Sequence, residues 1–205
     1  HEFDLKPAGL ARILETAKRG GFLLPVVSSN VNFSAADDRD NTLEQAFRSG
    51  LVKPYHVIVK DGIRIGLFGL IGKEAAEVAP FSKPVTFGDP VETAKKMTSL
   101  LRNKERADLV VCLSHSGLDP ENMSKSEDVR LARAVPDIDI IISGHTHTPL
   151  REPVVEGKTI IVQAWCYGLW VGILDVALRG GAPVLERYSI REIDDTIAGD
   201  PGIVA

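Results

Sequence analysis

The sequence predicts an α/β fold in which strands buried on both faces alternate with helices. Two apolar runs, 109–113 and 138–142, the second interrupted only by Asp139, are each followed by a short polar loop, and a segment of helical periodicity lies between them. Strands in the middle of a parallel sheet read as uninterrupted apolar runs because helices cover their faces. Beyond Lys158 the pattern is purely β. We therefore expect an α/β sandwich with a parallel component.

The N-terminal third contributes a helix, a strand and a loop. A helix is expected from Pro7 to Arg19, because apolar residues recur there at helical spacing and Gly20-Gly21 supplies a stop. The apolar run from Leu23 to Asn32 reads as a buried strand. The Asp-rich stretch from Ala35 to Asn41 reads as a polar loop.

The remaining elements follow from turn and capping signals. His56 to Ile71 reads as a hairpin around the tight turn Asp61-Gly62. Asp89 opens a helix with the form of a capping box, ending near Asn103. The helix between the two apolar runs stops at Pro136. The expected late strands are Thr159 to Ala164, Trp170 to Leu178 and Val184 to Ile193.

Composition restricts the class of partner. The chain has 205 residues, 44% hydrophobic and 25% charged, which suits one sizeable core. The net charge is −4 and no basic cluster is present, which argues against nucleic acid as the partner. A phosphate substrate would then be held by metal ions or backbone dipoles. No apolar run approaches the ~20 residues that span a bilayer. Cys112 and Cys166 read as buried small hydrophobes.

Three of the five histidines follow apolar strands directly. His115 ends one run, and His145 and His147 follow the next, about one strand–helix–strand unit later. Side chains from neighbouring parallel strands converge at the carboxyl edge of a sheet, where ligands bind. Neutral imidazole is a good ligand for zinc, manganese or iron. We therefore predict a divalent metal site at this edge, against the alternative of surface histidines in polar loops.

Other candidate residues admit two interpretations. Gly144 would let the backbone pass close to bound ions. His1 and Asp4 open a helix, and such a pair can place a protonated imidazole beside an anionic substrate as a general acid. Asp4 can equally be an N-terminal helix cap. His56, at the start of a hairpin strand, reads as a structural residue.

Several motifs together resemble the calcineurin-like metallophosphoesterases, in the 5'-nucleotidase branch. His1-Glu2-Phe3-Asp4 resembles the end of the family's Asn-His-Glu-Phe-Asp motif. Its Leu-Ser-His-x-Gly and Gly-His-x-His motifs are matched at 113–117 and 144–147. Ser28-Ser29-Asn30-Val31 is similar to its Ser-Ala-Asn-Ile segment, and 163–168 is similar to its Gln-Ala-x-x-Tyr-Gly segment. The order agrees from His1 to about Ile193.

The resemblance implies a four-layer αββα sandwich spanning 1–193 and a pair of divalent metal ions, Zn or Mn. It implies that His115 and His145 bind one ion and that His147 binds the other. A bridging water or hydroxide would attack phosphorus in line. His1, paired with Asp4, would be the catalytic histidine. Asn30 is a candidate for substrate binding.

The resemblance also implies parts that lie outside this sequence. The family's Asp-x-His motif, bridging Asp and Asn precede the position of His1, so we expect an N-terminally truncated domain with exposed sheet surface. Residues 194–205 read as a linker toward a C-terminal nucleotide-binding domain. Relatives are often exported, so a periplasmic or extracellular location is expected by resemblance.

The predicted activity is hydrolysis of nucleotide phosphate monoesters. Two alternatives share that chemistry, namely a 2',3'-cyclic nucleotide phosphodiesterase and a nucleotide-sugar pyrophosphatase. A third alternative, from another class, is a non-catalytic metal-binding or interaction module with an incomplete site. Trp165, Tyr167 and Trp170 read as core residues of the late strands, or else as the lining of a substrate cleft.

Overall fold

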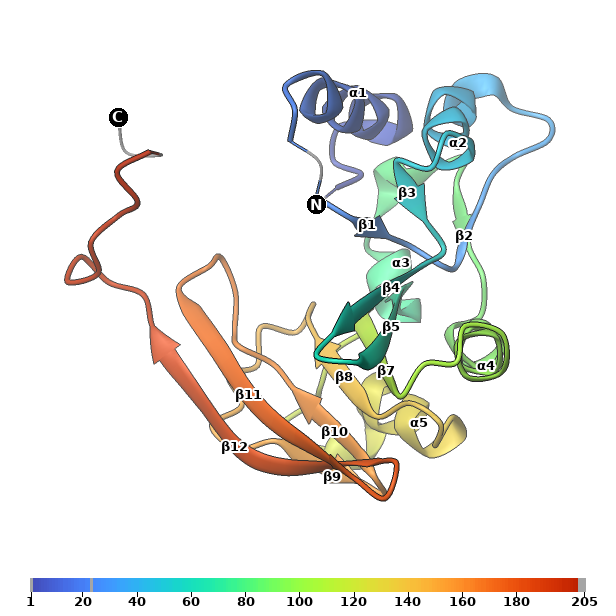
Figure 1. The fold of residues 1–205 in the computed structure, drawn as a ribbon. Coiled ribbons are helices and arrows are strands. Elements are labelled where there is room, and N and C mark those ends of the chain that lie inside the picture. Colours follow the sequence, from blue (N-terminus) through green and yellow to red (C-terminus); the bar gives the residue numbers. More distant parts are fainter. Residues whose placement is uncertain (1, 23, 203–205) are drawn as a thin grey trace.

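A six-stranded mixed sheet forms the centre of the molecule. The structure is a computed structural model that describes residues 2–22 and 24–202. The strand order is β4-β5-β7-β8-β10-β9, and the four inner strands run parallel while both edge strands are antiparallel to their neighbours (Figure 1). The bounds are β4 Tyr55–Lys60, β5 Ile63–Ile71, β7 Leu109–His115, β8 Ile140–Ser143, β9 Val154–Glu156 and β10 Thr159–Val162. The predicted parallel component is confirmed.

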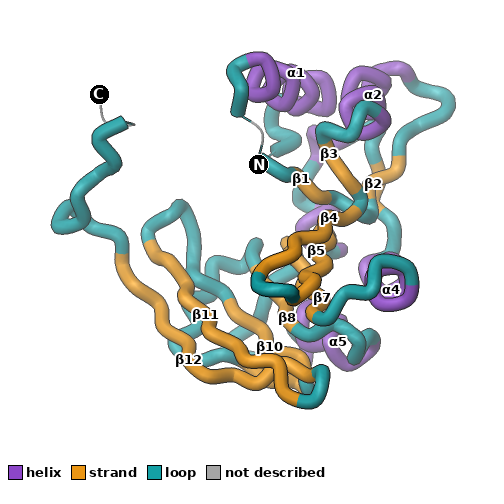
Figure 2. The backbone as a smooth tube through the Cα atoms, viewed as in Figure 1, coloured by secondary structure: helices purple, strands orange, loops and turns teal. Residues whose placement is uncertain are grey.

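Two helices cover one face of this sheet. Helix α4 spans Pro90–Asn103 and α5 spans Glu127–Ala134, and they lie together beside β5, β7 and β8 (Figure 2). The Asp89 carboxylate accepts from the backbone N–H groups of the first turn of α4, as the capping pattern predicts. The main core cluster lies between these helices and the sheet and is centred on Phe68, Leu101 and Ile141, each fully buried.

A long hairpin packs on the opposite face of the sheet. Its strands are β11 at Trp170–Arg179 and β12 at Ala182–Glu192. Leu174, Val176 and Leu178 of β11 join a cluster with apolar residues of β7 and β8. The expected late strands are thus confirmed. Figure 1 shows the layers: helices α4 and α5, the sheet, then the hairpin. Residues 194–202, which follow, contain no helix or strand.

The N-terminal third forms a further group with its own apolar cluster. Helix α1 (Lys6–Arg19) packs against α2 (Asn41–Arg48), and Phe3, Leu43 and Val85 are buried between them and nearby loops. Two short strand pairs join this group to the rest. They are β1 (Val26–Val27) with β3 (Val52–Lys53) and β2 (Val31–Asn32) with β6 (Thr86–Phe87). Short helices occur at Lys73–Glu77 (α3), Asp38–Asp40, Pro80–Ser82 and Met123–Lys125.

Two predictions for this region were wrong. The run 24–32 is not one buried strand but two two-residue strands, and Leu24 is 65% exposed. Pro25 lacks an N–H for a sheet ladder, and the side chains of Ser29 and Asn30 bond to the backbone of other segments. The stretch 35–41 is not only loop, because it contains a 3-10 turn leading into α2.

A buried ion pair fixes α4 to the amino end of β8. Asp139 is fully buried, and its carboxylate accepts from the Arg102 guanidinium and from the backbone N–H of Val110 at 2.7 Å. Arg102 also donates to the backbone carbonyl oxygens of Ala107 and Asp108. Within the part of the chain that the structure describes, every helix is too short or too polar to cross a bilayer.

Candidate active site

The predicted histidines lie at the carboxyl ends of two neighbouring strands. His115 is the last residue of β7, and His145 and His147 lie in the loop after β8. The two strands are in register up to Ser114 and Ser143, so their following residues emerge side by side. The ring centroids of His115 and His145 are 5.2 Å apart. The structure therefore brings together two residues that are thirty positions apart in the sequence.

Glycines allow the two histidine loops to approach each other. A Cβ on Gly144 would lie 3.1 Å from Nδ1 of His115, and a Cβ on Gly117 would lie 2.3 Å from Cγ2 of Thr146. Gly117 also has φ = +95°, a conformation that favours glycine. His145 and His147 themselves have positive φ, at 73° and 52°. Such left-handed backbone at non-glycine residues is costly, and it concentrates at functional sites.

The N-terminal segment reaches the same edge. Glu2 and Asp4 line a cavity of about 150 Å³ together with His115, and Glu2 and His115 also line a larger, mostly apolar groove of about 330 Å³. The N-cap of α1 is Leu5, so the alternative reading of Asp4 as the N-cap residue is wrong. His1, the predicted catalytic histidine, lies outside the described residues. Glu2 was not predicted as a site residue.

The surroundings of His115 favour its neutral form. Desolvation by the surrounding protein, and then the charge of His145, lower the pKa of His115, while the Glu2 carboxylate opposes this shift. The charge of His147 acts in the same direction as that of His145. A neutral imidazole is the form that binds a metal ion, so the lowered pKa suits the predicted role.

His147 lies beside exposed aromatic residues. Its ring meets Tyr167 edge-on, with centroids 5.2 Å apart. Tyr167 is 78% exposed and Trp165 is 40% exposed, so their prediction as core residues was wrong. Both have positive φ, which places their side chains on a tight loop after β10 rather than on a strand. Trp170, half-buried at the start of β11, packs edge-on against Trp165.

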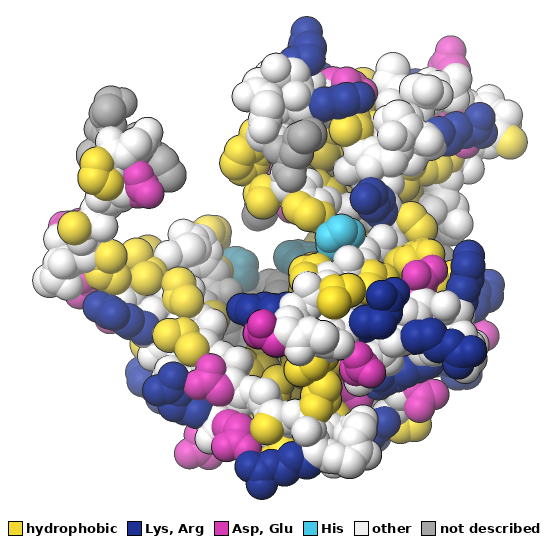
Figure 3. Space-filling model, in the orientation of Figure 1, with side chains coloured by type: hydrophobic (Ala, Val, Ile, Leu, Met, Phe, Trp, Pro, Cys, Tyr) yellow, Lys and Arg dark blue, Asp and Glu magenta, His cyan; other side chains and the backbone are white. Residues whose placement is uncertain are grey.

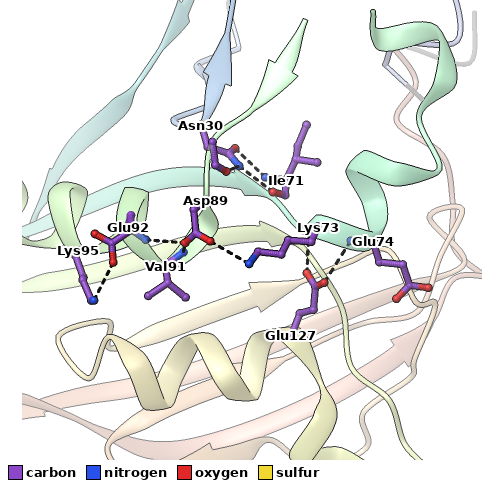
Figure 4. Close-up of polar contacts among 10 residues, drawn as sticks. Asn30, Ile71, Lys73, Glu74, Asp89, Val91, Glu92, Lys95 and Glu127 are labelled. Atoms are coloured by element: carbon purple, nitrogen blue, oxygen red, sulfur yellow. Dashed lines mark hydrogen bonds and ion pairs between the residues drawn. The ribbon is translucent and has the colours of Figure 1, made fainter.

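Asn30 is buried and joins three segments. Its amide nitrogen donates to the carbonyl oxygens of Ile71 and Gly88, and its amide oxygen accepts from the Ile71 N–H at 3.0 Å (Figure 4). These contacts hold the end of β5 against the β2–β6 pair. Its role in substrate binding stays a prediction. In the same view, Glu127 accepts from the backbone N–H of Lys73 and so caps α3.

A buried carboxylate lies beneath the histidine loops. Asp128, in the first turn of α5, is fully buried and accepts hydrogen bonds from Ser114, Ser143 and the backbone of Gly117. It was not predicted as a site residue, because an acidic residue in a first helical turn is common on surfaces. Asp128 stands out because of the donors that it contacts in the fold, and sequence spacing does not reveal these contacts.

Among the described residues, the imidazoles of His115 and His145 suit a divalent transition metal ion but would fill only part of its coordination shell. The rings of His115 and His145 are close enough together for a nitrogen of each to bind the same ion. Among residues 2–22 and 24–202, no three His, Cys, Asp or Glu side chains converge as a complete ligand set. Histidine side chains are visible on the hollowed face between the hairpin and the α1–α2 group (Figure 3). Cys112 is buried as predicted, whereas Cys166 is only partly buried.

Known proteins share this fold and sequence pattern. The calcineurin-like phosphoesterase family profile matches residues 34–149. The chain is 32% identical to the trifunctional nucleotide phosphoesterase YfkN of Bacillus subtilis over 86% of this chain and 13% of that protein. It is 28% identical to a 5'-nucleotidase of Vibrio cholerae over 93% of this chain and 36% of that protein.

A solved structure agrees with these relatives. The crystal structure of a 5'-nucleotidase precursor from Thermus thermophilus superposes with a TM-score of 0.68, at 31% identity, over 93% of this chain and 36% of that one. The chain therefore spans about a third or less of the length of these relatives.

Proposed function

Because the chain belongs to the calcineurin-like phosphoesterase family, we propose that its protein hydrolyses phosphate monoesters of nucleotides, using two divalent metal ions, zinc or manganese. The observation that carries the proposal is the pairing of His115 and His145, with ring centroids 5.2 Å apart at neighbouring strand ends. This edge also receives Glu2 and Asp4 from the N-terminal segment. The names of the relatives supply the substrate class, since they act on nucleotides.

Each site residue has a distinct role in this proposal. His115 and His145 would hold one ion and His147 the other. When bound, the ions would polarise phosphate oxygens and lower the pKa of the attacking water. His1 would stabilise the developing charge and give its proton to the leaving alkoxide, and Asp4 would keep the His1 ring in one tautomer. The lowered pKa of His115 keeps that ring neutral and available as a ligand.

A second candidate is a non-catalytic metal-binding or interaction module. The observation that favours it is the incomplete ligand set among the described residues. Titration of the protein with zinc or manganese, followed by calorimetry, separates the two. Two tight sites together with turnover support the phosphoesterase, whereas one weak site without turnover supports the module.

Alanine variants of the full-length protein test the assigned roles. His145→Ala should remove metal and activity together, whereas His1→Ala should reduce turnover of AMP and leave the metal content nearly unchanged. His56→Ala is the matched control, because His56 lies on β4 and outside the candidate site. Loss of bound metal in His1→Ala would contradict its assignment as the proton donor.

The substrate itself is tested by comparing AMP, 2',3'-cyclic AMP and a nucleotide sugar as substrates of the same preparation. Highest turnover on AMP supports the monoesterase. Preference for either of the others would identify the cyclic phosphodiesterase or the pyrophosphatase instead, with the same site residues.

A further inference from the structure

Hydroxyl residues surround each of the three histidines. Ser114 and Ser116 flank His115, Thr146 lies between His145 and His147, and Thr148 follows His147, while Ser143 ends the strand before them. Of these, Ser114, Ser116 and Thr148 are buried. Hydroxyls on buried loop residues need hydrogen-bond partners, and these partners fix the path of the loops.

Asp128 is the centre of the hydrogen bonds on one side. The hydroxyl of Ser114 donates to Oδ1 of Asp128 at 2.6 Å, and the hydroxyl of Ser143 donates to Oδ2 at 2.5 Å. The backbone N–H of Gly117 donates to Oδ2 at 3.1 Å. One carboxylate therefore holds the end of β7, the loop that follows His115, and the end of β8.

The other side of the network holds the loop that carries His145 and His147. Oγ1 of Thr146 accepts from the backbone N–H of Leu118 at 2.9 Å and lies 3.1 Å from Oγ1 of Thr148. The hydroxyl of Thr148 donates to the carbonyl oxygen of Leu118 at 3.2 Å. Leu118 directly follows Gly117, whose N–H is bound by Asp128. The two histidine loops are thus linked through consecutive residues.

We propose that Asp128 is a positioning residue that sets the relative placement of His115, His145 and His147 from beneath the sheet edge. This inference rests on the proposed function, because it assigns to Asp128 the orientation of the metal-binding rings. Residues that orient ligands without touching the metal commonly change metal affinity 10–100-fold when removed. The carboxylate suits this role because its two oxygens accept from three donors, one on each strand and one in the loop after β7, and a neutral side chain of similar size cannot accept as many.

Asp139 provides the matched control. It is another fully buried aspartate, and it lies at the opposite, amino end of β8, where it holds Arg102 and the backbone of Val110. Removing either carboxylate leaves buried donors without an acceptor, so both variants should lose stability. Only removal of Asp128 should disturb the histidine loops.

The first measurement is zinc affinity of the full-length protein, under conditions where circular dichroism shows every variant to be folded. We expect Asp128→Ala to weaken zinc binding about 10–100-fold, Asp128→Asn to weaken it less, and Asp139→Ala to leave it within about twofold of the wild type. Ser143→Ala removes only one of the three hydrogen bonds and should give a smaller loss in the same direction; it replaces Asp128→Ala if that variant does not fold. Equal losses in the Asp128 and Asp139 variants, or no loss in either, would overturn the proposal.

The second measurement needs no metal and separates this inference from the proposed function. In NMR spectra of the metal-free protein, Asp128→Ala should shift or broaden the ring resonances of His115, His145 and His147 and leave those of His56 unchanged. Asp139→Ala should leave all four unchanged. If the wild type binds no zinc, the proposed function fails, and these spectra still decide the positioning role. Unchanged ring resonances in Asp128→Ala would refute it.

Discussion

Replacing Asp128 by Asn should change how the stability of the protein depends on pH. Burial raises the pKa of Asp128 from 3.8 to about 6, and it outweighs the hydrogen bonds from Ser114, Ser143 and Gly117, which lower it. Between these two pH values the folded protein binds a proton that the unfolded chain has released. The stability provided by the protonated carboxyl is therefore complete below about pH 4 and is lost as the pH rises through about 6.

The size of the effect follows from the two pKa values. Their separation is about 2 pH units, and each unit corresponds to about 1.4 kcal/mol, so the total is about 3 kcal/mol. The wild type and Asp128→Asn share all other titrating groups, so the pH dependence of their stabilities should differ only by the titration of Asp128. We expect the free energy of unfolding of the wild type, minus that of the variant, to fall by about 3 kcal/mol between pH 3.5 and 7.

Urea unfolding of the metal-free protein at a series of pH values measures this difference. Asp37→Asn is the control for the sign. The hydrogen bond from Arg39 lowers the pKa of Asp37 from 3.8 to about 2, so its contribution should be present above about pH 4 and lost as the pH falls toward 2, opposite in sign to that of Asp128. A wild-type-minus-Asp128→Asn difference that stays constant within about 0.5 kcal/mol would refute the reasoning from burial.

Three further predictions concern the loops, the core and the site. Gly117→Ala should destabilise the protein by about 2 kcal/mol or more in thermal unfolding, since its Cβ would overlap Thr146. Gly157→Ala is the control, because Gly157 also has positive φ but has open space around it, and it should destabilise the protein less. Equal losses of stability in the two variants would contradict the overlap. Arg102→Ala should cost about 3–5 kcal/mol in urea unfolding, because it removes the guanidinium that hydrogen-bonds the buried Asp139 and leaves only the Lys158 ammonium, 4.0 Å away. A cost under about 1 kcal/mol would show that the Arg102–Asp139 pair is not needed. Activity and metal content of the full-length protein should fall together as the pH drops below about 6, because ligand imidazoles must be deprotonated, and a profile flat down to about pH 4 would contradict imidazole ligands.

The inner strands of the sheet were predictable because their apolar residues indicate that both faces of the strand are covered. The run 109–113 is apolar throughout and 138–142 is apolar except for Asp139, as is typical of strands covered on both faces, and the structure has a strand at each. The run 23–32 looks similar but misled the prediction, because side-chain hydrogen bonds from Asn30 to distant backbone decide its path. Helix α2 was missed because its eight residues carry only a short apolar stripe within a polar region.

The sequence predicted the positions of His115 and His145 in the candidate site, but it did not predict the buried Asp128 beneath them. A histidine directly after a buried strand must lie at the sheet edge, so the sequence alone indicated that His115 and His145 would meet. Nothing local marks Asp128 as buried, since an acidic residue in a first helical turn is normally solvated. Its burial depends on three donors that come from two strands and a loop, which only the folded arrangement brings together.

The ring of hydroxyl side chains around the histidines restricts how this region can vary among related proteins. Serine and threonine should replace each other at 114 and 143, because either supplies the O–H that the carboxylate at 128 accepts. Alanine or valine at those positions would leave that carboxylate without its hydroxyl donors, and an apolar residue at 128 would remove the carboxylate that accepts from both hydroxyls. Across an alignment, the three positions should therefore change together or remain fixed together, as one inherited unit.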